Sequence, residues 1–189
     1  AKRPILYLGG GVVHAGASGL AVELAEKAGL PTVMTLMALG AMPVDHPLSL
    51  GMLGMHAARY TNLALDECDL LIAVGARFDD RATGKVAAFC PQARIIHIDI
   101  DPAELDKIKT AHIGITADVQ EALNRLLPAV ATNARRDWRQ RVDSLKAEHP
   151  FLMPDVDKPL SHFGLIRTVA ACLDDEAVIA TDVGQHQMW

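Results

Sequence analysis

Cysteine is scarce in this sequence. Only Cys68, Cys90 and Cys172 occur among 189 residues. Their number is odd and no two stand in a Cys-x-x-Cys pair, which argues against a disulfide framework and against a zinc ribbon. A reducing compartment, the cytoplasm, fits this usage, and each thiol is expected to be a small buried apolar residue.

Basic charge and long apolar runs are missing as well. The 18 lysines and arginines face 23 aspartates and glutamates, for a formal net charge of −5. A protein that binds nucleic acid or an anionic membrane needs a basic surface, so we expect neither partner. No uncharged apolar run is long enough for a transmembrane helix, and Ala1–Pro4 shows no signal-peptide pattern.

What the sequence does contain is an alternation of short apolar runs and amphipathic segments. The runs expected to be strands are 4–8, 31–36, 69–74, 94–98, 113–117 and 177–181. The segments expected to be helices are 17–28, 118–130, 135–148 and 162–173. Because apolar strands separated by helices indicate a parallel sheet covered on both faces, we predict an α/β fold with a doubly wound, Rossmann-like parallel sheet.

The same pattern predicts the domain organisation. Residues 1–152 form the α/β domain, the proline-containing segment 153–160 is a linker, and 161–189 begin a further domain that is truncated here. We therefore interpret the chain as a piece of a larger protein.

Candidate sites follow the strands, because ligands of a doubly wound sheet bind beyond the carboxyl ends of its strands. Gly9-Gly10-Gly11 follows the first strand, and glycines allow backbone amides to approach a phosphate. The dinucleotide pattern Gly-x-Gly-x-x-Gly fails at His14, and the second strand ends without an acidic residue for a ribose. The loop predicts a dinucleotide pocket of another design, and a tight turn without a ligand is the alternative.

Two arginines and two carboxylates follow the third strand, in Arg77-Phe78-Asp79-Asp80-Arg81. Arginine binds a diphosphate bidentately, and the carboxylates are expected to hold the arginines in place. A self-satisfied surface ion-pair cluster is the alternative. On an extended loop Asp79 and Asp80 would point apart, which argues against joint acid–base work.

The remaining strand ends carry weaker signals. The long loop 37–53 is rich in methionine, which adapts to flat ligands but also fills cores. His56 has no partner at zinc-ligand spacing, so no metal site is predicted. Asp99 is assigned to a ligand, and Asp101 to a helix cap in front of Pro102. Asp118 is expected to cap the next helix, with Glu121 completing a capping box.

Several of these strings occur in an order that resembles the acetolactate synthase (acetohydroxyacid synthase) family, and most closely the large catalytic subunit of a bacterial biosynthetic isozyme. They are Gly9-Gly10-Gly11, Thr35-Leu36-Met37, Leu53-Gly54-Met55-His56, Gly75-Ala76-Arg77-Phe78-Asp79-Asp80-Arg81, His97-Ile98-Asp99-Ile100-Asp101 and Asp182-Val183-Gly184-Gln185-His186-Gln187-Met188-Trp189. The resemblance spans the whole chain. It implies a central FAD-binding domain followed by the start of the C-terminal thiamine-diphosphate domain.

The resemblance also implies an activity. The family is a transferase that condenses pyruvate with a second 2-keto acid, such as 2-ketobutyrate, in valine, leucine and isoleucine biosynthesis. Its cofactors are FAD, thiamine diphosphate and Mg²⁺, and it works as a homo-oligomer with a small regulatory subunit. The catalytic glutamate and the Mg²⁺-binding segment lie in parts of the family chain that this sequence lacks, so the fragment by itself is expected to be inactive.

Site residues follow from the same resemblance. Those implied to contact FAD are Gly10, Gly11, Thr35, Leu36, Met37, Leu53, Gly54, Met55, His56, Gly75, Arg77, Asp79, Arg81, Asp99, Ile100, Asp118 and Val119. Those implied to contact thiamine diphosphate are Val183, Gly184, Gln185 and His186. Met55, Asp80 and Arg81 would line the substrate and inhibitor channel, with Arg81 as the catalytic-site group that meets a substrate carboxylate.

One residue departs from the family pattern. Ala57 stands where the family usually has glycine, and a positive φ there would cost about 1 kcal/mol and weaken FAD binding. Two alternatives stay open. The chain could be the central domain of another thiamine-diphosphate enzyme, of the pyruvate oxidase or glyoxylate carboligase type, against which the Arg-Phe-Asp-Asp-Arg string argues. It could also be a non-catalytic nucleotide-binding module.

Overall fold

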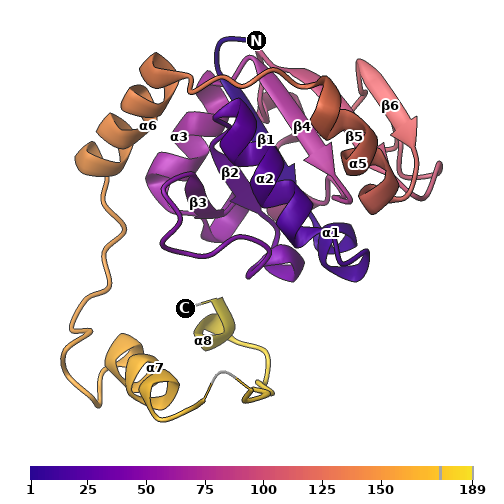
Figure 1. Ribbon diagram of the computed structural model, residues 1–189. Helices are drawn as coiled ribbons and strands as arrows, with labels where there is room; N and C mark the ends of the chain where they lie inside the picture. Colours follow the sequence, from indigo (N-terminus) through magenta and orange to yellow (C-terminus); the bar gives the residue numbers. More distant parts are fainter. Residues whose placement is uncertain (175, 189) are drawn as a thin grey trace. The chain divides into compact units, whose positions relative to one another are not determined.

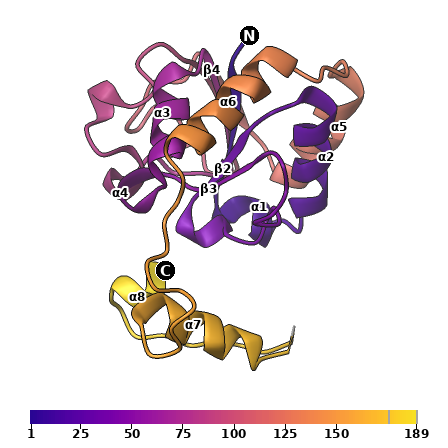
Figure 2. The same ribbon diagram turned by 90° about the vertical axis from the view of Figure 1, so that its left-hand side faces the viewer.

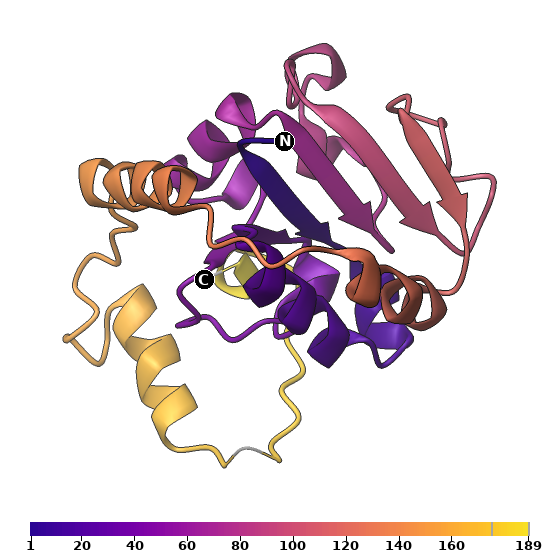
Figure 3. The same cartoon turned by 45° about the horizontal axis from the view of Figure 1, so that its top comes forward.

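The computed structural model describes residues 1–174 and 176–188. The chain divides into two units, Ala1–Pro150 and Phe151–Trp189, and each is described by itself. The first unit is built on six strands, all parallel. The longer strands can be followed in Figure 3, where their arrows point the same way.

The strand order makes this sheet a doubly wound one. The strands are β1 (Pro4–Leu8), β2 (Thr32–Met34), β3 (Ser49–Met52), β4 (Leu70–Val74), β5 (Arg94–Asp99) and β6 (Ile113–Thr116). Their order across the sheet is β3-β2-β1-β4-β5-β6, so the direction of winding reverses between β1 and β4. This is the order of the dinucleotide-binding sheets, and it confirms the predicted fold class.

Helices cover both faces of the sheet (Figures 1 and 2). On one face lie α1 (Gly10–His14), α2 (Ser18–Ala28) and α5 (Val119–Ala129), and on the other lie α3 (Arg59–Glu67) and α6 (Arg136–Glu148). None of the helices in the described part of the chain has the length and apolarity to cross a membrane.

The two faces of the central strand β1 belong to different parts of the core. Ile5 and Tyr7 pack with side chains of α3 and α6, whereas Leu6 and Leu8 pack with side chains of α1, α2 and α5. Side chains alternate between faces along a strand, so a strand covered on both sides must be apolar at every position. All five residues of β1 are buried accordingly.

The expectation of a loop over residues 37–53 was wrong in part. The segment begins within the short helix η1 (Leu36–Ala38) and ends in the edge strand β3, which pairs with β2. β3 was hard to predict, because it is only four residues long, contains Gly51 and is half-exposed at its end. Three more short helices lie between the strands: η2 (Gly54–His56), α4 (Asp80–Thr83) and η3 (Val86–Ala88).

The expected helix after Asp101 is also absent from the structure. The Asp101 carboxylate accepts a hydrogen bond from the Ala103 amide at 2.9 Å, but only turns follow it. Asp106 has a φ of +59°, in the left-handed region that a right-handed helix cannot accommodate. Asp101 therefore caps a turn.

The second unit contains α7 (His162–Ala171), whose first turn is capped by the Ser161 hydroxyl, and the short α8 (Gln185–Met188). Residues 177–181, expected to be a strand, have no regular secondary structure. A strand needs a neighbour for its backbone groups, and the described residues of this unit offer none. Val178 and Ile179 are correspondingly exposed.

Candidate functional site

A pocket of about 550 Å³ opens at the carboxyl ends of β1, β4 and β5, where the direction of winding reverses. Ligands of doubly wound sheets bind at this place. Eight of the residues assigned to FAD line it: Gly10, Gly11, Gly75, Arg77, Asp99, Ile100, Asp118 and Val119. The structure thus brings together residues from four separate segments of the chain.

The glycines let two loops touch. A Cβ built on Gly9 would lie 2.1 Å from the carbonyl oxygen of Gly75, and one built on Gly11 would lie 2.8 Å from the Gly75 Cα. Gly75 itself has a φ of +53°. No side chain fits between these loops, so the pocket floor is bare backbone.

The glycine loop differs in one respect from the expectation. The Gly11 amide donates a hydrogen bond of 3.0 Å to the Gly75 carbonyl, and the Val12 amide donates to Gly9. These two amides are therefore satisfied within the protein and do not point at a phosphate. The loop is also tighter than expected, because α1 begins at Gly10.

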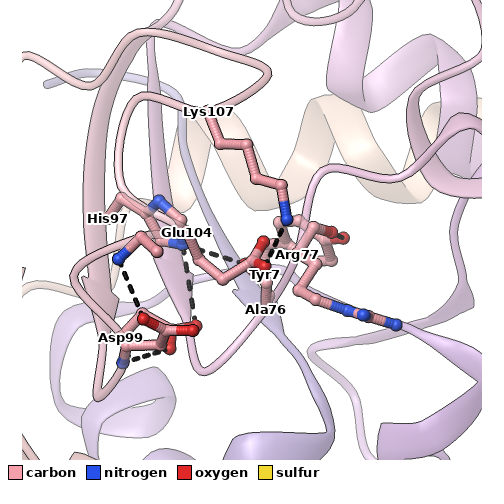
Figure 4. A network of polar contacts seen from close by, with 9 residues as sticks. Tyr7, Ala76, Arg77, His97, Asp99, Glu104 and Lys107 are labelled. Atoms are coloured by element: carbon pink, nitrogen blue, oxygen red, sulfur yellow. Dashed lines mark hydrogen bonds and ion pairs between the residues drawn. The ribbon is translucent and has the colours of Figure 1, made fainter.

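The loop that carries Arg77 is held from beneath by two buried rings (Figure 4). The Tyr7 hydroxyl donates to the Arg77 carbonyl at 2.7 Å, and His97 Nε2 donates to the Ala76 carbonyl at 2.9 Å. Phe78 packs edge-to-face against both rings, with centroids 5.7 Å from Tyr7 and 5.1 Å from His97. The backbone of Arg77 is thus fixed while its side chain reaches the solvent-exposed pocket.

Tyr7 remains a hydrogen-bond donor at any ordinary pH. Burial raises the pKa of its hydroxyl far above the usual value, the negative charge of Asp79 raises it further, and Arg77 opposes the shift. The loop therefore does not lose this contact by titration of Tyr7.

Carboxylates form the other wall of the pocket, contributed by Asp99, Asp101, Glu104 and Asp118. Asp99 is 8% exposed, and its Oδ1 accepts the Asp101 amide at 3.0 Å. Carboxylates accept hydrogen bonds from hydroxyl and amino groups, which a ribose and an adenine present, and an arginine binds a diphosphate.

Asp118 and Glu104, like Asp99 and Asp101, also have partners in the protein. Asp118 Oδ1 accepts the Glu121 amide at 3.1 Å, which confirms the predicted cap of α5. The Glu121 side chain does not close a capping box with Asp118, because it pairs with Arg125 at 2.6 Å. Glu104 pairs with Lys107 at 2.7 Å beside the pocket (Figure 4).

A second cavity, of about 410 Å³, lies where η2 meets α4. Gly54, Met55 and Asp80 line it, and Arg81 Nη1 lies 3.9 Å from the Met55 sulfur. The three residues assigned to the substrate channel, Met55, Asp80 and Arg81, are therefore neighbours in the structure.

Asp79 and Asp80 were expected on an extended loop, but the structure does not place them on one. Asp79 Oδ1 accepts the Ala82 amide at 3.1 Å and caps α4, which begins at Asp80. Within the described residues neither carboxylate forms an ion pair with Arg77 or Arg81. Both the expected support of the arginines by these carboxylates and the alternative ion-pair cluster are therefore wrong.

The residues that follow β2 lie beside the glycine loop. The Thr35 amide donates to the Leu8 carbonyl at 2.9 Å, and a Cβ built on Gly10 would lie 3.1 Å from the Cβ of Met37. Thr35 Oγ1 is buried and has no hydrogen-bond partner. Leu36 begins η1.

The remaining assigned residues differ in exposure. Leu53 is buried and its amide donates to Met34, whereas His56 is exposed at the end of η2. Ala57 has a φ of −69°, so the strain considered for a side chain at this position does not arise.

Val183, Gly184, Gln185 and His186 belong to the second unit, at the start of α8. Val183 is 86% exposed, and its amide donates to the Asp182 carboxylate at 2.7 Å. Among the residues that the structure describes, no group of three or more histidine, cysteine, aspartate or glutamate side chains is placed to hold a metal ion.

Three residues in or behind the site were given no role from the sequence: Tyr7, Glu104, and His97, which appears only within one of the strings that carry the resemblance. Tyr7 stands in an otherwise apolar strand and His97 follows two isoleucines in β5, and a ring that can form hydrogen bonds at such positions was the available signal. Glu104 gave no signal beyond its charge.

Comparison with known proteins agrees with this geometry. Residues 1–126 match the family described as thiamine pyrophosphate enzyme, central domain. The chain is 62% identical to the acetolactate synthase isozyme 1 large subunit of Escherichia coli (strain K12), over 100% of this chain and 33% of that protein. It is 44% identical to the isozyme 2 large subunit of the same organism, over 100% of this chain and 34% of that protein.

A plant protein is similar over the same extent. Acetolactate synthase 1, chloroplastic, of Oryza sativa subsp. japonica is 46% identical over 100% of this chain and 30% of its own length. The chain therefore spans about a third of the length of the curated relatives it matches.

Proposed function

The chain belongs to the thiamine pyrophosphate enzyme family, whose central domain it contains, and on that premise we propose that it is the FAD-binding central domain of an acetolactate synthase. The observation that carries the proposal is the pocket at the β1–β4 switch point, which Arg77 lines together with several carboxylates. The names of the relatives support the enzyme class.

The pocket residues fit the groups of FAD. The pocket floor around Gly11 and Gly75 carries no side chain, because a Cβ at either glycine would clash with the other, and the diphosphate would lie over this bare backbone. Arg77 would hold the diphosphate, and Asp99 and Asp118 would accept hydrogen bonds from the ribose and adenine. The unpartnered Thr35 Oγ1 provides one further polar contact near the glycine loop.

We assign the rest of the flavin contacts to the adjoining segments. These residues are Gly10, Leu36, Met37, Leu53, Gly54, Met55, His56, Asp79, Arg81, Ile100 and Val119. A bound flavin supplies a flat, redox-capable ring, although condensation of two keto acids involves no net redox change.

The substrates proposed for the whole enzyme are pyruvate and a second 2-keto acid such as 2-ketobutyrate. We assign the substrate channel to the cavity lined by Met55 and Asp80, where Arg81 is the group that would bind a keto-acid carboxylate. Asp79 is occupied as the cap of α4, so Asp80 is the free carboxylate of the pair.

Other parts of the whole protein complete the enzyme. We propose that residues 153–160 link the α/β domain, residues 1–152, to the start of the thiamine-diphosphate domain. Val183, Gly184, Gln185 and His186 would form one edge of that cofactor's site, because Val183, Gln185 and His186 are exposed and do not enclose a ligand themselves. Mg²⁺ would be held outside this chain. A homo-oligomer, a small regulatory subunit and a cytoplasmic location complete the proposal.

A titration of the chain with FAD, followed by flavin absorbance and fluorescence, tests the proposal. We expect saturable one-to-one binding, and at least about tenfold weaker binding for Arg77→Ala, since a hydrogen bond to a charged group contributes about 1.5–3 kcal/mol. Arg125→Ala, which removes an exposed arginine of α5 outside the pocket, is the matched control.

Either of two results would contradict the proposal. Absence of FAD binding by a folded chain would favour a non-catalytic module, and equal affinity in parent and Arg77→Ala would place the flavin elsewhere. The chain alone should form no acetolactate from pyruvate with thiamine diphosphate, Mg²⁺ and FAD, and detection of acetoin derived from acetolactate would show that expectation to be wrong.

A further inference from the structure

We propose that His97, together with Tyr7, is a positioning residue for nucleotide binding, because it fixes the backbone of the loop that presents Arg77. The inference rests on the proposed function and extends it to two residues outside the pocket lining. Neither ring touches the ligand space. Each acts through the loop Gly75–Phe78.

The sheet register places the two rings in one row. Tyr7 of β1 stands opposite Ala73 of β4, and Ala73 stands opposite His97 of β5. Neighbouring residues in one row of a sheet project to the same face, so two rings flank one small side chain. The space above Ala73 is then available to the chain as it leaves β4, and Phe78 packs there between both rings.

Two successive carbonyl groups of the loop accept hydrogen bonds from the two rings. His97 Nε2 binds the Ala76 oxygen at 2.9 Å, and the Tyr7 hydroxyl binds the Arg77 oxygen at 2.7 Å. Both rings are 0% exposed, so neither bond competes with bulk water. Two donors from the strands on either side of β4 thus determine the direction in which the Arg77 side chain leaves the backbone (Figure 4).

The remaining contacts of His97 indicate a role beyond filling the core. A carbonyl oxygen only accepts, so Nε2 carries the proton, and Nδ1 is buried without a hydrogen-bond partner. A buried polar atom without a partner is costly, and an apolar side chain of similar volume would avoid that cost. His97 Nε2 also lies 3.9 Å from Asp99 Oδ2, so this one ring stands behind both the arginine wall and the carboxylate wall of the pocket.

A double-mutant cycle on the full chain tests the inference. FAD dissociation constants would be measured for the parent, His97→Leu, Arg77→Ala and the double variant. We expect His97→Leu to weaken binding about tenfold in the parent but less than about twofold in the Arg77→Ala background, because residues that act through one another are not additive. His97→Gln, which retains an N–H donor, should restore most of the affinity.

Tyr7→Phe provides a second, milder variant that removes only the hydroxyl. It should weaken FAD binding severalfold, and its effect should likewise disappear when Arg77 is alanine. Should His97→Leu fail to fold, this variant carries the test alone.

Trp138→Phe is the matched control. Trp138 Nε1 donates to the Pro4 carbonyl at 2.9 Å, so the control also deletes a buried ring donor to the backbone, but at the opposite end of β1. It should lower the melting temperature while leaving FAD affinity within about twofold. Equal losses of FAD affinity in His97→Leu and Trp138→Phe, or an undiminished effect of His97→Leu without Arg77, would overturn the proposal.

Hydrogen exchange separates this inference from the proposed function. Absence of FAD binding by the parent chain would refute the flavin assignment. Amide exchange over residues 75–78 needs no ligand, and it should be faster in His97→Leu and Tyr7→Phe than in Trp138→Phe. Equal exchange in all three variants would show that the rings do not position the loop.

Discussion

Gly54 and Arg81 are in direct backbone contact, so that a Cβ on Gly54 would lie 2.1 Å from the Arg81 carbonyl oxygen. This contact brings η2 against α4 and places the Met55 sulfur 3.9 Å from the Arg81 guanidinium. The neighbouring cavity therefore depends on a position where no side chain can be accommodated.

A Gly54→Ala substitution tests this contact against a control three residues earlier in the chain. Gly54 and Gly51 have φ values of +89° and +70°, but nothing lies within 4 Å of a Cβ on Gly51. We expect Gly51→Ala to cost about 1 kcal/mol of conformational strain, and Gly54→Ala to cost about 1–3 kcal/mol more through overpacking. Urea denaturation of both variants measures the difference, and equal losses of stability would contradict the packing described.

Substitutions of the two adjacent aspartates should differ in their effect on stability, because Asp79 caps α4 and Asp80 does not. Asp79→Ala removes the cap of α4 and should lower the free energy of unfolding by about 1 kcal/mol. Asp79→Asn, whose side chain can still accept the Ala82 amide, should lower it by less. Asp80→Ala should stay within about 0.5 kcal/mol of the parent, since Asp80 is exposed and caps nothing. Thermal denaturation compares the three, and a larger loss for Asp80→Ala would reverse the assignment.

Acid should remove a stabilising contribution of Glu67. The hydrogen bond from Arg141, at 2.6 Å, and the charge of Arg141 lower the pKa of Glu67 below its usual value, although burial opposes the shift. A carboxylate with a lowered pKa stabilises the fold above its unfolded pKa of about 4.3, and this contribution is lost as the pH falls through the folded pKa.

Melting temperatures of parent and Glu67→Gln at pH 7 and at about pH 3 measure this linkage. The variant should melt at a lower temperature than the parent at pH 7, and the difference between the two melting temperatures should become smaller at about pH 3. Glu23→Gln on α2 is the control, because Glu23 forms no ion pair within the described residues. A gap for Glu67→Gln that is constant with pH would rule out the linkage.

Restoring glycine at position 57 should bring no gain. Ala57 has an ordinary extended backbone, with φ −69° and ψ 153°. Ala57→Gly should therefore leave FAD affinity within about twofold, and lower stability by about 0.4–1 kcal/mol through the entropy of the unfolded chain. A flavin titration and a denaturation curve measure the two quantities. Tighter FAD binding by the variant would show that Ala57 weakens the binding of FAD.

The sheet and its order of elements could be predicted because its cause is local. Strands buried on both faces must be apolar at every position, and the runs at β1 and β4 show this directly. The cap of α5 at Asp118 was also readable, because a capping carboxylate acts within three residues.

The structural features that were not predicted correctly share a different cause. Residues 177–181 look like a strand, but strand formation depends on a neighbour that the described part of that unit does not contain. The amide of Gly11 in the glycine loop is bound by the distant Gly75 carbonyl. The rings of Tyr7 and His97 likewise bind carbonyls of the loop that follows β4. Such long-range pairings are set by the register of the sheet, which a single sequence does not reveal. The flavin and substrate contacts stay predictions.

The central place of β1 has a consequence for how the chain folds. β1 precedes the other strands of its sheet in the chain, yet one of its two edges pairs with β4, in a register that joins Pro4 to Leu70 and Leu8 to Val74. Closing so large a loop costs entropy before any contact repays it, so parallel sheets of this kind fold slowly. Until β4 emerges, a strand that is buried at every position in the folded domain presents an open edge to other chains, and nascent or heat-stressed molecules should aggregate through Ile5–Leu8 before they lose the helices around it.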